Sequence, residues 1–348
     1  MDWTYFKRRI YIDNCTKEDL FKKWATPKGL TEWFIAEATY EFEDGNFREP
    51  NEFVQINDRY TWKFHKGSTV TGKVLKVKEN ALFKFTFGKK EPDVDEDVIV
   101  TVTIYEKDGR CYFDLLQENM ASSNYGKVNY YISCNMGWMF HMNNLKSLYE
   151  SGHDLRVTGE NRMHVDAPSG YPLDQFKWTE FKQKEFISAP REAVFKKWVI
   201  PRNITGWFVA EAVYRYDETM IRKPDEIIKS GDRYKWIFFQ GIEVEGTILN
   251  IIENELLSLT FGQKEPGSDE HVIVDIYFSS ENDSKTKVEL QQKNIADSEY
   301  GQVNYTLSCM IGWCYFLTNL RSVFESGYDL REKDKEPALE SQEYTLDR

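Results

Sequence analysis

The sequence is short of the features that mark membrane, secreted and nucleic-acid-binding proteins. None of its apolar runs approaches the roughly 20 residues that a membrane-spanning helix needs. The opening stretch "MDWTYFKRRIYIDN" contains no apolar signal segment, and the five cysteines show no CxxC spacing. The formal net charge of −12 repels phosphate backbones and anionic lipid surfaces. We therefore predict a cytoplasmic protein with free thiols, no integral membrane segment and no nucleic-acid partner.

Motifs for catalysis and for metal binding are equally scarce. The five histidines include no pair at metal-ligand spacing, and the sequence has neither a Gly-rich phosphate loop nor a nucleophile elbow. Cys134 and Cys309 lie in apolar helical stretches, where a buried structural thiol is a more ordinary interpretation than a nucleophile. We therefore predict no catalytic residue, no metal site and no cofactor.

What the sequence has in quantity is aromatic residues, at 15%, and internal repetition. "WFIAEA" at 33–38 returns as "WFVAEA" at 207–212, and "DRYTWKF" at 58–64 returns as "DRYKWIF" at 232–238. The stretch from Gly137 to Arg156 returns at 312–331 with eleven of its twenty residues unchanged. A period of 174 or 175 residues is too long for a solenoid repeat, so the chain contains two copies of one whole domain.

The repeat sets the predicted domain boundaries. Domain one spans residues 1–156 and domain two spans residues 177–331. Between them, residues 157–176 are polar and rich in proline and glycine, which is typical of a linker. Residues 332–348 lack apolar periodicity and are predicted to form a flexible tail.

Each copy has the pattern of an α+β domain. Aromatic residues alternate with polar ones over 60–64 and 83–87, which predicts antiparallel strands with one apolar face. A helix-period pattern over about 128–150 follows and predicts one long C-terminal helix that covers the sheet. Gly137 and Gly312 each cost about 1 kcal/mol within that helix, so we expect the sheet or an aromatic ring to approach the backbone there.

The order of elements resembles the helix-grip, START-like (SRPBCC) superfamily. The "GW…NLKSLYESG" helix, the "EWF" turn and the "DRYTW" strand are most similar to its branch named for the C-terminal domain of the activator of heat-shock-protein-90 ATPase. The resemblance implies two tandem helix-grip domains, each a curved antiparallel sheet on a long helix with two short helices near its start. It also implies a cavity between sheet and helix, in which members bind lipids, polyketides or hormones. A few members of the superfamily are hydrolases or cyclases.

The residues expected to line this space are mostly aromatic, and they can equally form a filled core. In the strand after residue 110, Gln117 and its match Gln292 alternate inward, where they serve either the following loop or a ligand. Asn129 and Asn304, near the start of the long helix, serve either helix structure or a ligand. The complete candidate set is Trp33, Tyr60, Trp62, Phe85, Phe87, Gln117, Asn129, Trp138, Trp207, Tyr234, Trp236, Phe261, Gln292, Asn304 and Trp313.

Three functions fit this sequence. The first is non-catalytic binding of a hydrophobic small molecule or lipid in the space between sheet and helix. The second is a protein-interaction or chaperone-associated module with filled cores, whose partner is another protein. The third and weakest is a hydrolase or cyclase that uses polar groups of the cavity. The volume left between sheet and helix separates the first from the second.

Overall fold

The structure is a computed structural model, and it describes residues 1–42, 45–65, 67–88, 96–156, 176–262, 268 and 270–333. The chain divides into two compact units, whose described parts lie within residues 1–156 and 176–333. The predicted linker lies outside the described residues except for Phe176, and the predicted tail does so except for Glu332 and Lys333. Among the residues described, no helix is both long and apolar enough to cross a bilayer.

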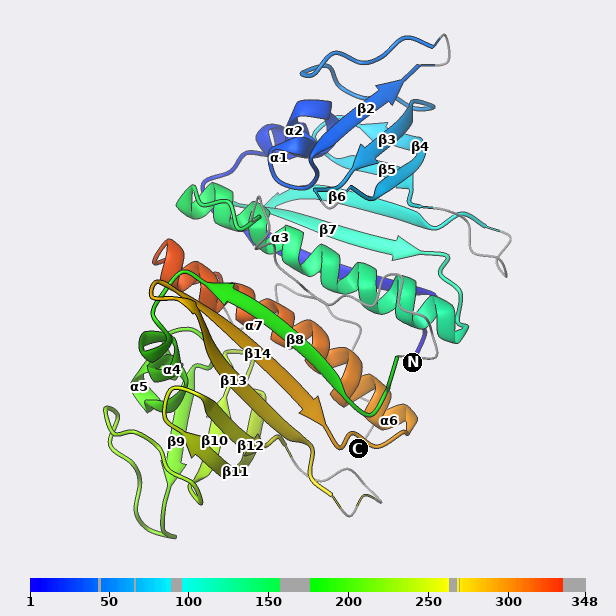
Figure 1. Cartoon of the computed structure of the whole chain (residues 1–348). Coiled ribbons are helices and arrows are strands. Elements are labelled where there is room, and N and C mark those ends of the chain that lie inside the picture. Colours follow the sequence, from blue (N-terminus) through cyan, green and yellow to red (C-terminus); the bar gives the residue numbers. More distant parts are fainter. Residues whose placement is uncertain are drawn as a thin grey trace. The chain divides into compact units, whose positions relative to one another are not determined.

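The first unit is a seven-stranded antiparallel sheet with one long helix along it (Figure 1). The strands lie in the order β1-β7-β6-β5-β4-β3-β2, so only β1 is displaced from its sequence neighbours. The elements are β1 (Tyr5–Ile12), α1 (Lys17–Ala25), α2 (Pro27–Thr31), β2 (Glu37–Glu41), β3 (Arg59–Lys63), β4 (Thr69–Lys78), β5 (Leu82–Thr86), β6 (Ile99–Lys107), β7 (Arg110–Glu118), a π-helical segment (Gly126–Ile132) and α3 (Ser133–Ser151).

The second unit repeats this architecture strand for strand, in the order β8-β14-β13-β12-β11-β10-β9. Its elements are β8 (Phe181–Ile187), α4 (Arg191–Val199), α5 (Pro201–Ile204), β9 (Glu211–Arg215), β10 (Arg233–Ile237), β11 (Glu243–Ile252), β12 (Leu256–Thr260), β13 (Ile273–Asn282), β14 (Lys285–Lys293), α6 (Glu299–Gly301), a π-helical segment (Gln302–Leu307) and α7 (Ser308–Glu325). The predicted α+β fold, two tandem helix-grip domains, is confirmed.

The alternation seen in the sequence sets which side of each sheet is buried. In β3, Tyr60 and Trp62 are buried while the residues between and beside them are exposed. In β5, Phe83 and Phe85 are buried, and Phe85 is paired with buried Val100 of β6. One face of the sheet is therefore apolar, and burying it under the long helix removes that area from water.

The long helix differs from the prediction at its start. In each unit its first turns are π-helical, and the α-helix begins only at Ser133 and Ser308. The wider turns leave carbonyls for other donors, and the Ser133 hydroxyl donates to the Val128 carbonyl at 2.9 Å. The Ser308 hydroxyl makes the matching bond to Val303 at 2.8 Å. At the other end of α3, Gly152 adopts a left-handed conformation and caps the helix, as glycine commonly does.

The expected close approach at the two helix glycines is wrong. A Cβ added at Gly137 or Gly312 would meet no atom within 4 Å beyond the helix itself, so open space lies beside both. The tight glycines are instead in the sheets. A Cβ at Gly72 of β4 would lie 2.5 Å from the Tyr60 hydroxyl and from the Thr86 carbonyl oxygen, and Gly246 of β11 is similarly crowded. Tyr60 can cross β4 only because position 72 has no side chain.

Candidate functional site

The interior of domain one is filled by aromatic rings in contact. Trp24 and Trp33 meet edge to face with ring centroids 4.7 Å apart, and Tyr60 stacks on Trp62 at 4.1 Å. Trp62 in turn meets Phe85 at 5.1 Å. All five side chains are buried. Of the predicted lining residues, Trp33, Tyr60, Trp62 and Phe85 thus lie in a packed core, where such pairs add about 0.5–1.5 kcal/mol each beyond their buried area.

Domain two has the same core with the same contacts. Trp198 and Trp207 meet edge to face at 4.6 Å, and Tyr234 lies 4.1 Å from Trp236. The tyrosine hydroxyl finds the same partner in both domains, because Tyr60 donates to the Thr86 carbonyl and Tyr234 to the Thr260 carbonyl, at 2.5 and 2.7 Å. Trp207, Tyr234 and Trp236 are therefore as deeply placed as their counterparts in domain one.

The two inward glutamines bond to the long helix rather than to a loop alone. The Trp138 indole N–H donates to Oε1 of Gln117 at 2.8 Å, and the Trp313 indole N–H donates to Oε1 of Gln292 at 3.0 Å. The amide nitrogen of Gln117 lies 3.3 Å from the Met120 sulfur, and that of Gln292 donates to the Tyr305 carbonyl at 2.8 Å. Each tryptophan–glutamine pair fixes the helix on the sheet, a link that sequence reasoning missed.

The two helix asparagines have a structural role in the wide first turns. Nδ2 of Asn129 donates to the Tyr125 carbonyl at 3.3 Å, and Nδ2 of Asn304 donates to the Tyr300 carbonyl at 3.0 Å. Both acceptors lie four residues earlier in the chain, so each side chain supplements the backbone ladder of its own helix. Neither bond reaches the aromatic core.

Open space lies beside each helix glycine, and half-buried rings contact neighbouring residues of the same helix; we call this feature the aromatic mouth. In domain one it comprises Phe64, Phe87, Gly137 and His141. Phe87 lies 5.3 Å from Trp138, and the rings of Phe64 and His141 are 6.5 Å apart. Because positions 137 and 141 are neighbours on one helix face, the missing side chain leaves room next to the imidazole.

The aromatic mouth of domain two comprises Phe238, Phe261, Gly312 and Phe316. Phe261 lies 5.5 Å from Trp313, and Phe238 lies 5.5 Å from Phe316. Among the predicted lining residues, Phe87 and Phe261 are half-buried and contact Trp138 and Trp313, which directly follow the two glycines. The signal that could have found the mouth was the glycine itself, which the sequence marks in both copies.

His141 is the one chemical difference at this place, because Phe316 occupies the matching position in domain two. Burial, together with the nearby charges of Arg156 and His65, lowers the pKa of His141 to about 3, so the ring is neutral at physiological pH. Nδ1 of His141 is buried without a hydrogen-bond partner in the described part of the chain. Sequence reasoning considered this histidine only as a metal ligand or catalyst and missed its position.

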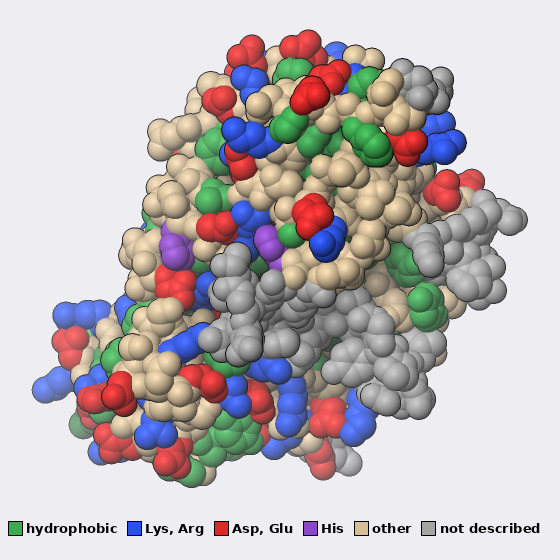
Figure 2. Space-filling model, turned by 45° about the horizontal axis from the view of Figure 1, so that its top comes forward, with side chains coloured by type: hydrophobic (Ala, Val, Ile, Leu, Met, Phe, Trp, Pro, Cys, Tyr) green, Lys and Arg blue, Asp and Glu red, His purple; other side chains and the backbone are tan. Residues whose placement is uncertain are grey.

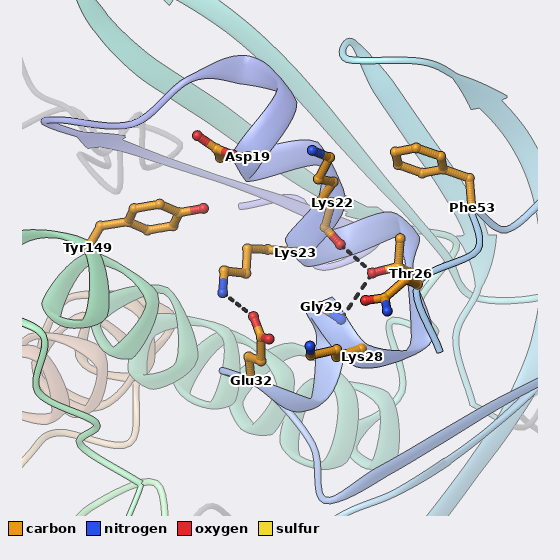
Figure 3. Close-up of a pocket in the computed structure, with 10 residues that line it drawn as sticks. Asp19, Lys22, Lys23, Thr26, Lys28, Gly29, Glu32, Phe53 and Tyr149 are labelled. Carbon is orange, nitrogen blue, oxygen red and sulfur yellow. Dashed lines mark hydrogen bonds and ion pairs between the residues drawn. The ribbon is translucent and has the colours of Figure 1, made fainter. Parts of the chain in front are cut away.

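A polar pocket of about 510 Å³ lies on the surface of domain one, between α1, α2 and the end of α3 (Figure 3). Lys23 and Glu32 form an ion pair across it, and Tyr149 projects toward it from α3. The Thr26 hydroxyl accepts from the Gly29 N–H at 3.0 Å and donates to the Lys22 carbonyl at 2.9 Å. These bonds hold α2 on α1, whereas the Tyr149 hydroxyl is buried without a hydrogen-bond partner among the described residues.

Charge gives no further candidate. On the face drawn in Figure 2, acidic and basic side chains are interspersed, and neither sign gathers into a patch among the residues shown in colour. Within the described ranges no group of three or more His, Cys, Asp or Glu side chains could hold a metal ion. The five cysteines are free. Burial raises the pKa of Cys309 to about 12, which keeps its thiol protonated.

An antiparallel sheet wrapped on one long C-terminal helix, present twice in one chain, defines a tandem helix-grip protein of the START-like (SRPBCC) class. The family described as "Activator of Hsp90 ATPase homolog 1-like protein" matches residues 14–150 and 188–325. The chain belongs to this family, with one copy in each domain, and the predicted resemblance is confirmed. Members of this fold bind ligands in a cavity. No curated protein matches the chain.

Several solved structures are similar to this chain. The Aha1 dimer from Colwellia psychrerythraea is 15% identical, with 42% of this chain and 97% of that chain covered and a TM-score of 0.35. Protein SSP2350 from Staphylococcus saprophyticus is 21% identical, with 44% and 96% covered and a TM-score of 0.33. DynU16, from the dynemicin biosynthetic locus, is 9% identical, with 94% and 99% covered and a TM-score of 0.35.

Proposed function

We propose that this chain is a non-catalytic binding protein that takes up a hydrophobic small molecule or lipid at the aromatic mouth of each domain. The observation that carries the proposal is the open space beside Gly137 and Gly312, at the same place in both domains. The half-buried rings of Phe87 and Phe261 contact Trp138 and Trp313, which directly follow the two glycines. An apolar molecule seated there would remove ring surface from water at about 25 cal/mol per Å².

The packing of the deeper core limits the size of the ligand. Trp33, Tyr60, Trp62 and Phe85 are buried and in ring contact, so the proposed ligand lies at the mouth and does not penetrate among them. Because Gln117 bonds to Trp138 inside the core, its amide contributes by fixing the floor of the site rather than by touching the ligand. Gln292 and Trp313 correspond in domain two. A cytoplasmic location, with all cysteines free, belongs to the same proposal.

The test fills the open space. N-phenyl-1-naphthylamine, a neutral probe whose fluorescence rises in apolar surroundings, is titrated into the parent protein and into a Gly137→Leu/Gly312→Leu double variant. We expect the parent to bind and the double variant to bind at least tenfold more weakly. Replacing glycine within a helix favours the helix by about 1 kcal/mol, so the melting temperature should not fall and unfolding cannot explain a loss.

The matched control is Gly137→Ala/Gly312→Ala, which makes most of the same change in helix propensity but leaves most of the space open. It should bind the probe nearly as well as the parent. Undiminished binding by the leucine variant would place the site elsewhere and refute the proposal.

The second candidate is a protein-interaction or chaperone-associated module. The filled aromatic cores favour it, because a domain with rings in contact from sheet to helix is stable without a ligand. Absence of probe binding by the parent, up to the solubility limit of the probe, would favour this candidate over the first.

A further inference from the structure

The polar pocket on the surface of domain one is built on a framework that domain two repeats. The Lys28 N–H donates to the Pro50 carbonyl at 2.8 Å, and the Val54 N–H donates to the Ala25 carbonyl at 2.9 Å. The matching bonds in domain two, at 2.9 and 3.0 Å, join Arg202 to Pro224 and Ile228 to Val199. In both domains the loop before the third strand is therefore tied to the two short helices, and any difference between the two places lies in the side chains.

Three lysines line the pocket of domain one, and two of them are free of ion pairs. Lys23 pairs with Glu32. Lys22 on α1 and Lys28 on α2 are exposed, and within the part of the chain that the structure describes neither ammonium group forms an ion pair (Figure 3). The pocket therefore presents two positive charges that the protein itself does not neutralise.

The acidic side chains of the pocket are already engaged. Glu32 is the partner of Lys23, and the Asp19 carboxylate accepts a hydrogen bond from the Thr16 hydroxyl at 2.8 Å, at the start of α1. Three lysines and two carboxylates leave the lining with a net charge of +1. The net charge of the whole protein is −12, but a small anion responds mainly to charges within a Debye length, about 8 Å at physiological ionic strength.

At the matching place in domain two the corresponding cations are neutralised by the protein. The ion pairs are Lys196 with Glu192 at 2.5 Å and Arg202 with Asp225 at 3.0 Å. Asp225 corresponds to Asn51 of domain one, which lines the pocket there. An uncharged amide thus stands where domain two has the carboxylate, and Lys28, the counterpart of Arg202, is left without a counter-charge.

We propose that this pocket of domain one binds small organic anions, whose phosphate or carboxylate group lies between Lys22 and Lys28. The anion supplies from outside the counter-charge that domain two supplies from its own side chains. Asn51 is exposed and adds an uncharged hydrogen-bond donor, and the half-buried Phe53 ring adds apolar surface to the lining. The volume of about 510 Å³ suits a metabolite-sized molecule. The site shares no residue with the aromatic mouths, so it goes beyond the proposed function and does not depend on it.

The experiment compares three probes with the same phenyl ring: phenyl phosphate, benzoate and the uncharged benzamide. Each is titrated into the full chain by calorimetry, at low and at physiological ionic strength. We expect both anions to bind more tightly than benzamide and to weaken as salt is added, because exposed charges are screened. The tighter of the two anions identifies the charged group that the pocket prefers.

Two variants with the same change in net charge locate the site. Lys22→Gln/Lys28→Gln should weaken the binding of phenyl phosphate by about fivefold or more, since each lost charge removes one favourable contact with the anion. Lys196→Gln/Arg202→Gln makes the same change in domain two and should leave the affinity unaltered. These side chains are exposed, so the variants should fold normally.

A third variant tests the comparison between the domains directly. Asn51→Asp introduces the carboxylate that domain two carries at this position, and it should weaken phenyl phosphate binding by about threefold or more. Gly137→Leu/Gly312→Leu fills both aromatic mouths and should not affect it.

Three results would overturn the inference. The first is binding of benzamide as tightly as the anions, and the second is an equal loss of affinity in the two lysine-region variants, which would show a general effect of charge. The third is the absence of binding by both anions at low ionic strength. None of these results bears on apolar binding at the mouths, whereas loss of phenyl phosphate binding in the mouth-filled variant would move this site to the mouths.

Discussion

Replacing Gln117 by leucine tests whether the tryptophan–glutamine pair holds the long helix on the sheet. Leucine is close to glutamine in volume, so little cavity forms, but the Trp138 indole N–H loses its acceptor in a place where both side chains are buried. Such an orphaned donor costs about 1–3 kcal/mol. For a domain of this size, 1 kcal/mol corresponds to roughly 2–4 °C in melting temperature, so we expect a drop of about 2–12 °C.

The double variant sharpens the test. Trp138→Phe alone leaves the Gln117 carbonyl oxygen without its donor, whereas Gln117→Leu/Trp138→Phe removes both polar groups. The free energies of unfolding, measured by urea titration and near-ultraviolet circular dichroism, should therefore be non-additive by about 1–3 kcal/mol, with the double variant more stable than the sum predicts. Gln292→Leu with Trp313→Phe is the matched cycle in domain two. Additivity within 0.5 kcal/mol in both cycles would refute the reasoning.

Truncating either helix tryptophan, Trp138→Ala or Trp313→Ala, should destabilise its own domain by about 3–5 kcal/mol in calorimetry, and simultaneous loss of both domain transitions would contradict independent folding. Gly72→Ala should destabilise domain one by about 1–3 kcal/mol, because its Cβ would fall 2.5 Å from both the Tyr60 hydroxyl and the Thr86 carbonyl oxygen; a neutral result in thermal melts would show that this ring and the adjoining strand can both move aside. Burial raises the pKa of the Glu185 carboxyl to about 7, although Arg321 lies 3.7 Å away. The native state therefore binds the carboxyl proton more tightly than the unfolded chain does, and the stability of the protein falls as pH rises from about 4.5 to 7. Glu185→Gln should therefore stabilise the protein at pH 8 by up to about 3 kcal/mol and leave it unchanged at pH 4, and a destabilised variant at pH 8 would mean that the ion pair with Arg321 outweighs burial.

The sequence could predict those features that depend on short-range periodicity or on the internal repeat. Alternation around Tyr60 and Trp62 identified the buried face of a strand, and the spacing of apolar residues identified the long helix. The pairing of Gln117 with Trp138 was missed because the two residues are 21 positions apart and lie on different elements, and no local pattern fixes which helix position faces which strand position. The alternation along the strand predicted that the Gln117 side chain points to the buried face of the sheet, but it did not identify the group to which that side chain bonds.

The same limit explains the two errors at the helix. Propensity shows that Gly137 is costly in a helix, but the cost is the same whether a neighbour crowds the position or nothing fills it. The π-helical start was also missed, although Gly126–Ile132 is rich in glycine, β-branched and aromatic residues, which are weak helix formers. The sequence marks both glycines, but whether the space beside them is filled or open could be seen only in the structure.

The π-helical starts of the two long helices also record the history of the chain. A π-helical turn holds more residues than an α-helical turn, and such turns are rare in proteins. Gly126–Ile132 and Gln302–Leu307 occupy the same place in the two domains, and each is followed by a serine that bonds to the carbonyl five residues before it. Because both domains share this feature, the simplest order of events puts it in a single-domain ancestor, before duplication, and puts the divergence between His141 and Phe316 after it.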